Sequence, residues 1–364
     1  MRMSPTLSAY IGRQFLLWFA GMMLAILAIV FLLDTVELLR RAAGKPDATF
    51  WVVVRMGLFK LPAMAQEAFP FIVLFSAMFT FWRLTRSQEL VVARAVGVSA
   101  WQFLAPVLVL APLIGAFQIT VVNPVGSVLV AQFERMEDRY LRGRANELAV
   151  ARSGLWLREV TDEGQFLVHA GSVTPGSQEL RDVVIFELEG DEEFVSRVDA
   201  PSATLEDGYW VVRDGWYNRP DHLPELLAEH RVPTDLTFAR IAESLAPPET
   251  MSFWELPGFI ATLEATGISA VRHRLHYQSL LAQPVLFCAM VLFAAAFSLR
   301  QTRRGGTLLM VAGGVVTGFV LFLLSDVVLA FGVSETIPVP MAAWAPAAAS
   351  LLIGIAALLH LEDG

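Results

Sequence analysis

Charged residues are scarce in this chain. They make up 17% of its 364 residues, whereas hydrophobic residues make up 55%, and the mean hydropathy is +0.55. This balance lies outside the usual range of soluble proteins and is typical of membrane proteins. Cysteine is almost absent, because the single Cys288 lies within an apolar run and has no disulfide partner in the chain. A disulfide-stapled secreted scaffold is therefore excluded.

The sequence also lacks the common motifs of enzymes and nucleotide-binding proteins. No G-x-x-x-x-G-K-[ST] sequence occurs, and Gly44-Lys45-Pro46 has neither the upstream glycine nor the hydroxyl residue of a phosphate-binding loop. The motifs H-E-x-x-H and G-x-S-x-G are missing as well. His273 and His276 have no acidic or sulfur ligand nearby in sequence and predict an interfacial pair. We therefore expect no cofactor and no metal site, and the net charge of −8 argues against nucleic acid as a partner.

Six long apolar stretches predict six membrane-spanning helices. The first, Phe15 to Leu33, has no charged side chain and is long enough to cross a hydrocarbon core of about 30 Å. No small-residue cleavage site follows it, so we expect a retained span and not a signal peptide. Three spans precede a polar middle region, residues 125–275, and three follow it. The other five stretches lie at about 61–82, 103–122, 280–299, 307–331 and 341–361.

Arginines near the ends of the spans predict the orientation of the chain in the membrane. Because basic residues favour the cytoplasmic side, these clusters place both termini in the cytoplasm and residues 125–275 outside it. Arg40, Arg41 and Lys45 fall on the opposite side and suggest either another task or a preference of cations for a helix C-terminus. The cytoplasmic clusters are Arg2 with Arg13, then Arg83, Arg86 and Arg94, then Arg300, Arg303 and Arg304.

The middle region predicts a β domain. A helical pattern at 127–147 gives way to a period of two residues, which is typical of strands. Glu206-Asp207-Gly208 and Asp214-Gly215 are the clearest turns. Because no helices separate the strands, we expect an antiparallel β-jelly roll at about 150–245, inserted between the third and fourth transmembrane helices. A return helix at about 253–266 follows, and the strands are expected at 155–157, 165–168, 183–188, 194–198, 203–205 and 209–212.

Residues 83–97 form a short charged pattern between two apolar spans. On a helical wheel Arg83, Arg86 and Arg94 fall within an arc of roughly 80°, opposite an apolar side. The pattern predicts a helix that either docks a cytoplasmic partner or lies in the lipid headgroup layer.

Other features within the spans leave alternatives open. Asp326 either faces a partner or a hydrated cavity, or lies near the outer end of its helix. The same two alternatives apply to Glu67. Gly314 and Gly318 allow close packing of a neighbouring helix, either from the same chain or from a second subunit.

Four short motifs carry a likeness to a known group of membrane proteins. They are Tyr10-Ile11-Gly12-Arg13, the run from Arg86-Ser87-Gln88-Glu89 to Gly97, Ser153-Gly154-Leu155-Trp156, and Gln283-Pro284. Through them and through the order of its parts, nearly the whole chain resembles the LptF/LptG permease family of lipopolysaccharide export. Within that family the second half and the closing residues are more similar to the LptG branch.

The resemblance implies a transport permease and not an enzyme. A member of this family is an ABC-type permease subunit in the inner membrane of a Gram-negative bacterium. It pairs with an LptF-like second permease and sits on two copies of the ATPase LptB. It extracts lipopolysaccharide and passes it to the periplasmic protein LptC.

The resemblance also implies roles for particular residues. The positions that match the ATPase-coupling segment are Arg86, Glu89, Leu90 and Arg94. Lipopolysaccharide phosphates need cations near the outer headgroups, a role that falls to Arg40, Arg41 and Lys45. Asp34 and Glu37 depart from the family pattern at this position. Residues expected in the jelly-roll interior, either guiding acyl chains or forming the core of the domain, are Trp156, Phe166, Val168, Phe186 and Trp210.

Two other functions stay open at this point. A lipoprotein-releasing type permease also exports from the inner membrane, but its outer domain follows the first of four spans. A membrane scaffold or sensor would use the β domain to bind a periplasmic ligand. Copurification of an ATPase would separate transport from the scaffold.

Overall fold

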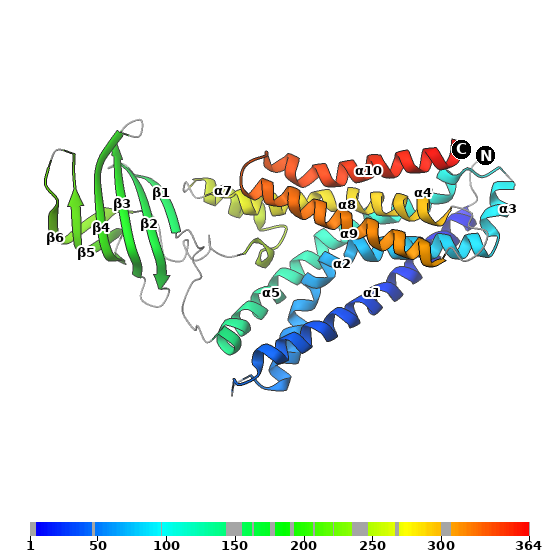
Figure 1. Ribbon diagram of the computed structural model, residues 1–364, viewed down its shortest axis with the longest axis horizontal. Coiled ribbons are helices and arrows are strands. Elements are labelled where there is room, and N and C mark those ends of the chain that lie inside the picture. The colour runs from blue at the N-terminus through cyan, green and yellow to red at the C-terminus, as the bar shows by residue number, and fades with distance from the viewer. Residues whose placement is uncertain are drawn as a thin grey trace. The chain divides into compact units, whose positions relative to one another are not determined.

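The computed structural model describes residues 5–45, 48–95, 97–142, 155–161, 164–174, 179–189, 193–206, 208–220, 222–234, 247–265, 269–299 and 307–363. These residues form two compact units. One unit comprises residues 1–141, 249–256 and 271–364, and the other comprises residues 142–248 and 257–270. Figure 1 shows the helices of the first unit and the sheet of the second.

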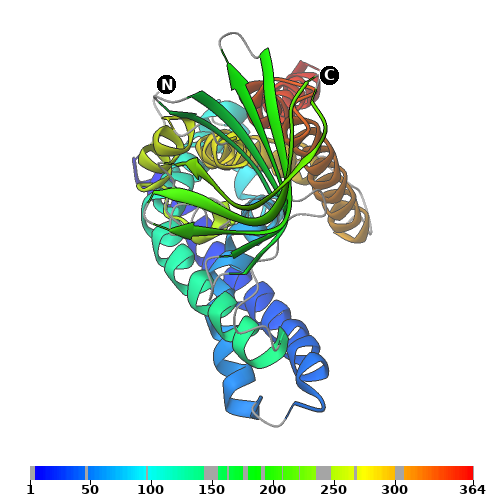
Figure 2. The ribbon, with the colours of Figure 1, turned by 90° about the vertical axis from the view of Figure 1, so that its left-hand side faces the viewer.

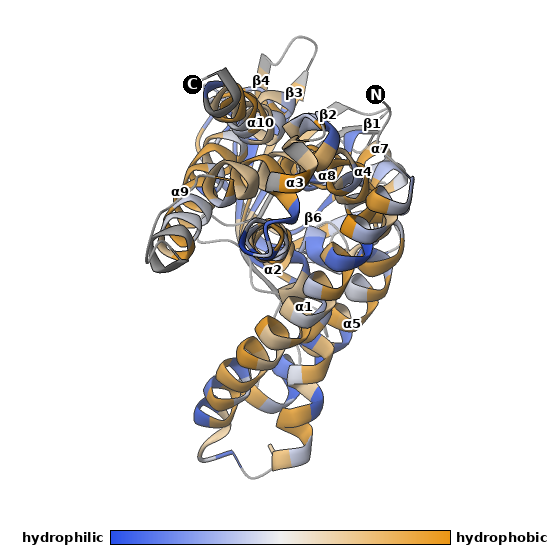
Figure 3. Cartoon of the chain, turned by 90° about the vertical axis from the view of Figure 1, so that its right-hand side faces the viewer, coloured by the Kyte–Doolittle hydropathy of each residue, from blue (hydrophilic) through white to orange (hydrophobic). Residues whose placement is uncertain are grey.

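The first unit is a bundle of long helices. Within the described residues, six helical stretches are long and apolar enough to cross a membrane. Figure 3 shows hydrophobic residues along most of the length of these helices. The structure thus agrees with the six predicted spans, although most helices continue beyond the apolar stretches. The helices of the bundle are α1 (Pro5–Ala42), α2 (Phe50–Arg86), α3 (Glu89–Ala95), α4 (Ala100–Phe117), α5 (Asn123–Glu137), α8 (Val271–Ser298), α9 (Thr307–Val333) and α10 (Val339–Asp363).

The core of the bundle lies between α2, α4 and α8. Phe69 of α2 stacks on Phe287 of α8 with ring centroids 6.1 Å apart. The helices α4 and α8 approach closely, since a Cβ atom on Gly115 would lie 2.8 Å from the Cα atom of Pro284. Helix packing in a membrane depends on such contacts, because lipid is as apolar as the side chains that it surrounds.

Small residues of α9 also pack within the chain. A Cβ atom on Gly314 would lie 2.5 Å from the sulfur of Met78, and one on Gly318 would lie 3.0 Å from the ring of Phe71. Both neighbours belong to α2. The pair of glycines therefore fits α9 against α2, which answers one of the questions left open by the sequence.

A polar junction holds the third span to the segment that precedes α7 (Leu256–Ala265). Here α4 and α5 are joined by a π-helical turn, η1 (Gln118–Val122). The amide of Asn123 donates to Oε1 of Gln66 at 3.1 Å, and the backbone N–H of Phe253 donates to Oδ1 of Asn123 at 2.8 Å. Since the alternative in a membrane is an unsatisfied polar group, these bonds fix the segment to the bundle.

The predicted helical extension at 127–147 is described up to Arg142. α5 ends at Glu137 and is followed by the turn η2 (Asp138–Arg142), while residues 143–154 lie outside the described part. Phe133 of α5 belongs to a buried cluster with Val53 and Met56 of α2. For this reason α5 belongs to the bundle and not to the β domain.

The second unit contains a six-stranded antiparallel sheet in the order β1-β2-β3-β4-β5-β6. Neighbouring strands in the sheet are also neighbours in sequence, so the described strands form a meander. Figure 2 shows that this sheet is strongly curved. A jelly roll packs two sheets face to face, whereas the described residues form one. The strands are β1 (Leu155–Thr161), β2 (Gly164–Thr174), β3 (Glu179–Glu189), β4 (Glu193–Glu206), β5 (Tyr209–Asn218) and β6 (Glu225–Pro233).

The strands correct several details of the sequence prediction. The stretches 194–198 and 203–205 are parts of one long strand, β4, and β6 was not predicted. β4 ends at Glu206 and β5 begins at Tyr209, and Gly208 has a positive φ of 82°, whereas Asp207 of the predicted turn lies outside the described residues. Asp214-Gly215 is not a turn, because both residues lie within β5. Gly215 is needed there, since a Cβ atom would lie 3.0 Å from Val212.

We expect Gly115→Ala to destabilise the bundle. The added methyl group meets the backbone of Pro284, and overpacking of this kind costs about 1–3 kcal/mol. The measurement is the thermal unfolding temperature of the full chain in mild detergent. Gly21→Ala on α1 is the matched control, since nothing lies within 4 Å of its added Cβ atom. Equal unfolding temperatures for the two variants would contradict the close α4–α8 packing.

Candidate functional site

The first candidate site is the connection between α2 and α4. The predicted single helix over residues 83–97 is in fact interrupted: α2 ends at Arg86 and α3 begins at Glu89. Gln88 has a positive φ of 63°, a conformation that a continuing helix cannot contain. The hydroxyl of Ser87 donates to a carboxylate oxygen of Glu89 at 2.8 Å. This turn makes α3 a separate short helix.

The residues of α3 and its turn face different ways. Leu90 is only 4% exposed and belongs to the same buried cluster as Leu84 and Phe103. Arg86 is exposed, with its guanidinium carbon 5.3 Å from the ring centroid of Trp82. The side chain of Arg94 lies outside what the structure describes. Leu90 therefore anchors α3, while Arg86 remains on the surface.

Two further residues belong to this site and were missed by sequence reasoning. The hydroxyl of Tyr10 donates to Glu89 at 3.4 Å, so the first turns of α1 lie beside α3. Val92 is 62% exposed, although it belonged to the apolar side of the predicted helix. The break at Ser87 and Gln88 changes which residues of α3 face inward, and this could not be seen from a continuous helical wheel.

The second candidate site lies at the C-terminal end of α1, where the predicted substrate cations are found. Arg40 is exposed and bonded to Glu37 of the same helix at 2.7 and 2.8 Å. Arg41 instead donates to Glu137 of α5, whose side chain is only 8% exposed. Lys45 is half-buried in the connection between α1 and α2. The structure thus places the three cations at one end of the bundle but gives them different surroundings.

An additional ion pair occurs one turn earlier on α1. The ammonium group of Lys60 lies 2.6 Å from Oδ1 of Asp34 and 5.5 Å from the ring centroid of Phe133. Asp34 is mostly buried, so this pair links α1 to α2. The acidic residues that depart from the family pattern are therefore occupied by cations of the chain itself: Asp34 by Lys60 and Glu37 by Arg40.

These pairs differ in how easily a phosphate can replace the carboxylate. An exposed pair such as Arg40–Glu37 gains little free energy from its interaction, so Arg40 can exchange partners at small cost. Removing Arg41 from Glu137 would leave a buried carboxylate without its cation. The geometry therefore makes Arg40 the more available ligand for an anionic headgroup.

The two sites lie at opposite ends of α1. From Tyr10 to Arg41 this helix rises about 46 Å at about 1.5 Å per residue. A hydrocarbon core is only about 30 Å thick. Figure 1 also shows both chain ends at the end of the bundle that carries α3.

The residues predicted for the interior of the β domain are partly together. Phe166, Val168 and Trp210 belong to one buried cluster on a single face of the sheet. Phe186 lies on the other face, because it pairs with Arg197, whose guanidinium carbon is 5.5 Å from its ring centroid. Its placement in the interior is therefore corrected: strand side chains alternate, and Ile185 occupies the inner position. The side chain of Trp156 is outside the described part of β1.

One titratable residue of the sheet has an altered pKa. Burial lowers the pKa of His230 on β6, and the charge of Glu187 partly opposes this effect. The ring of His230 lies 5.3 Å from that of Tyr217 on the neighbouring strand. The lowered pKa of His230 therefore follows from the packing of its ring within the sheet.

In the part of the chain that the structure describes, six span-length helices and an antiparallel sheet indicate a multi-pass membrane protein with a β domain. The family of the lipopolysaccharide export system permease LptF/LptG matches residues 9–360. Because the match covers nearly the whole chain, the protein belongs to this family of transport permeases.

Known relatives agree with this assignment. The chain is 24% identical to the lipopolysaccharide export system permease protein LptG of Escherichia coli K12 over 368 aligned positions. The alignment covers 97% of this chain and 98% of that protein. LptG of Escherichia coli O6:H1 strain CFT073 matches to the same extent.

We expect Glu137→Gln to destabilise the full chain, because it removes the charged partner of Arg41 inside the bundle. Loss of such a bond costs about 1–3 kcal/mol. Denaturant unfolding in detergent is the measurement, with Glu37→Gln as the matched control at an exposed pair. The tie between α1 and α5 would be refuted if Glu37→Gln proved as destabilising as Glu137→Gln.

Proposed function

We propose that this chain is a permease subunit of an ABC-type transporter that extracts lipopolysaccharide from the inner membrane and passes it toward the outer membrane. Family membership over residues 9–360 is the observation that carries the proposal. The separation of the two candidate sites along α1 supports it, since a coupled transporter needs an energy input on one side and a substrate site on the other. The sequence has no nucleotide-binding loop, so we infer that a partner hydrolyses ATP.

In this proposal the α2–α3 turn is the ATPase contact. Arginines near this end, including Arg13, Arg83 and Arg86, favour its cytoplasmic location, with both termini on the same side. Two copies of an LptB-like ATPase would serve this chain and its second permease. Arg86, Glu89 and Arg94 supply charges for the contact, and exposed Val92 adds apolar area.

The position of Leu90 gives a physical means of transmission. It is buried in the cluster that contains Leu84 of α2 and Phe103 of α4. A displacement of α3 would therefore be carried to two spanning helices, because a close-packed core does not absorb it.

The outer end of α1 is the proposed lipopolysaccharide site. Arg40 would exchange Glu37 for a lipid A phosphate, with Lys45 nearby. Arg41 holds α1 to α5 and contributes positive charge to the same region. Leu24, Leu32 and Leu33 of α1 are exposed apolar residues, which we assign to acyl chains and to the LptF-like second permease.

The β domain would form the start of the periplasmic bridge. We infer that it is a jelly-roll domain inserted between the third and fourth spans, whose apolar cluster faces the acyl chains. Within the described residues, β1 and β6 are the edges of its sheet. An LptC-like partner would add a strand at such an edge, since edge strands present unpaired N–H and C=O groups.

Glu89→Lys is expected to uncouple the ATPase. The change reverses the charge at the start of α3, so copurification of the ATPase should fall by roughly tenfold, as for a loss of about 1.4 kcal/mol. Stimulated ATP hydrolysis should fall with it. Glu335→Lys, at an exposed position between α9 and α10, is the control. Normal copurification together with normal hydrolysis in Glu89→Lys would remove α3 from the proposed contact.

Arg40→Gln and Glu37→Gln should act in opposite directions on substrate binding. The first removes the proposed phosphate ligand, and the second frees Arg40 from its competing carboxylate. The amount of lipopolysaccharide that copurifies should fall in Arg40→Gln and stay equal or rise in Glu37→Gln, with complex assembly unchanged in both. A fall in both variants, or in neither, would count against Arg40 as the ligand.

A further inference from the structure

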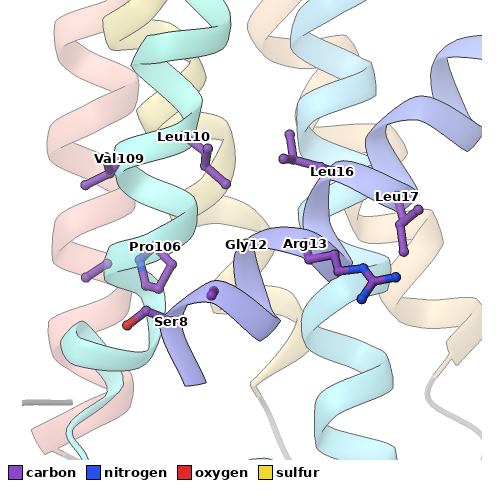
Figure 4. A pocket seen from close by; sticks show the side chains of 10 residues that line it. Ser8, Gly12, Arg13, Leu16, Leu17, Pro106, Val109 and Leu110 are labelled. Atoms are coloured by element: carbon purple, nitrogen blue, oxygen red, sulfur yellow. The ribbon is translucent and has the colours of Figure 1, made fainter. Parts of the chain in front are cut away.

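An open groove lies between the first turns of α1 and the middle of α4. It has a volume of about 780 Å³. Figure 4 shows that the two helices lie close together near Gly12 and Pro106 and separate toward Leu16, Leu17 and Val109. A Cβ atom on Gly12 would lie 3.3 Å from Leu110, so the contact at the closed end is tight. The closed end of the groove is therefore formed by direct contact between the two helices.

The lining of the groove changes along α1. Ser8 and Arg13 supply the polar groups near its start, and Leu16 and Leu17 follow. The opposite wall, on α4, is apolar, with Val109 exposed to 60%. Within the described residues no carboxylate pairs with Arg13. A cation next to an open apolar groove matches a molecule with an anionic head and a hydrocarbon tail.

The length of the groove along α1 matches the thickness of the hydrocarbon part of one leaflet. Ser8 to Leu17 covers about 14 Å at about 1.5 Å per residue. Half of a hydrocarbon core is about 15 Å. A second cavity, of about 440 Å³, has no charged lining residue and shares Leu110 with the groove.

The polar end of the groove lies at the α3 end of the bundle. Tyr10 contacts Glu89 of α3. Gln14, with its amide turned to satisfy its neighbours, accepts from Arg83 at 3.1 Å and from the indole of Trp18 at 2.8 Å. These contacts hold the start of α1 beside the last turn of α2. In the orientation proposed above, this is the cytoplasmic leaflet.

We propose that this groove binds an anionic phospholipid, with the phosphate on Arg13 and an acyl chain between α1 and α4. This lipid is distinct from the transported lipopolysaccharide, whose proposed site is at the other end of α1. It would fill the gap that opens between α1 and α4 and support α1 there. The leaflet assignment rests on the proposed orientation, but the site itself does not.

The test uses the full chain in phosphatidylcholine nanodiscs that contain a small fraction of diazirine-bearing phosphatidylglycerol. After irradiation, peptide mass mapping should place the adducts on residues 8–17 and 105–110. Arg13→Gln should reduce this labelling roughly tenfold, in line with the loss of one charge-assisted hydrogen bond. Ala105→Trp, which fills the groove, should abolish it.

Matched variants serve as controls. Arg272→Gln removes an exposed arginine at the other end of a span, and Ala348→Trp adds the same bulk to an exposed position of α10. Both should leave the labelling unchanged. The labelling needs neither ATP nor lipopolysaccharide. A negative labelling result would therefore leave the transport proposal unaffected, and a failure of the transport proposal would leave the lipid site unaffected.

Three outcomes would overturn the proposal. Equal labelling of the exposed apolar face of α9 would mean an ordinary lipid shell. Equal labelling by diazirine-bearing phosphatidylcholine would mean that the groove does not select an anionic head. In the complex isolated with its partners, a photocrosslinker at Val109 that captures a protein would mean that a partner helix occupies the groove.

Discussion

Close contact between helices at small residues is the constraint on which the membrane part depends. Lipid gives no hydrophobic driving force for association, so the helices are held by packing and by a few polar bonds. Gly115 leaves space for Pro284, and Gly314 leaves space for Met78. At Asn123 a side-chain hydrogen bond to Gln66 adds to the apolar packing. Where this packing is complete, between α2, α4 and α8, the core is buried. Where it is absent, along much of α1, the chain leaves apolar surface for lipid or for partners.

Ion pairs determine which cations near the C-terminal end of α1 can bind another anion. Four cations near its C-terminal end have acidic neighbours or half-buried positions, and only Arg40 combines high exposure with an exposed partner. Charge counting would treat Arg40 and Arg41 alike. Burial separates them, because the cost of leaving a carboxylate unpaired grows steeply once water is excluded.

The sequence was sufficient for features that depend on composition and period. The long apolar stretches predicted the spans, and alternation predicted most strands. Features that depend on a single backbone angle or on a distant partner were not accessible. The break at Gln88 needs one positive φ, and the role of Glu137 needs α1 and α5 to meet. β6 was missed because Glu225 to Pro233 is rich in Glu, Leu and Ala, which are typical of helices, and it becomes a strand only by pairing with β5.

α1 is the helix that contributes residues to both candidate sites and to the groove. Its first turns contact α3 and border the groove with α4, and near its other end Asp34 and Arg41 tie it to Lys60 of α2 and Glu137 of α5. Between these points few residues of α1 are fully buried, but Phe19, Met23 and Leu27 pack against the core. An occupant of the groove beside Arg13 would therefore touch the same part of α1 that contacts α3, while the ion pairs to α2 and α5 hold the opposite end of the helix.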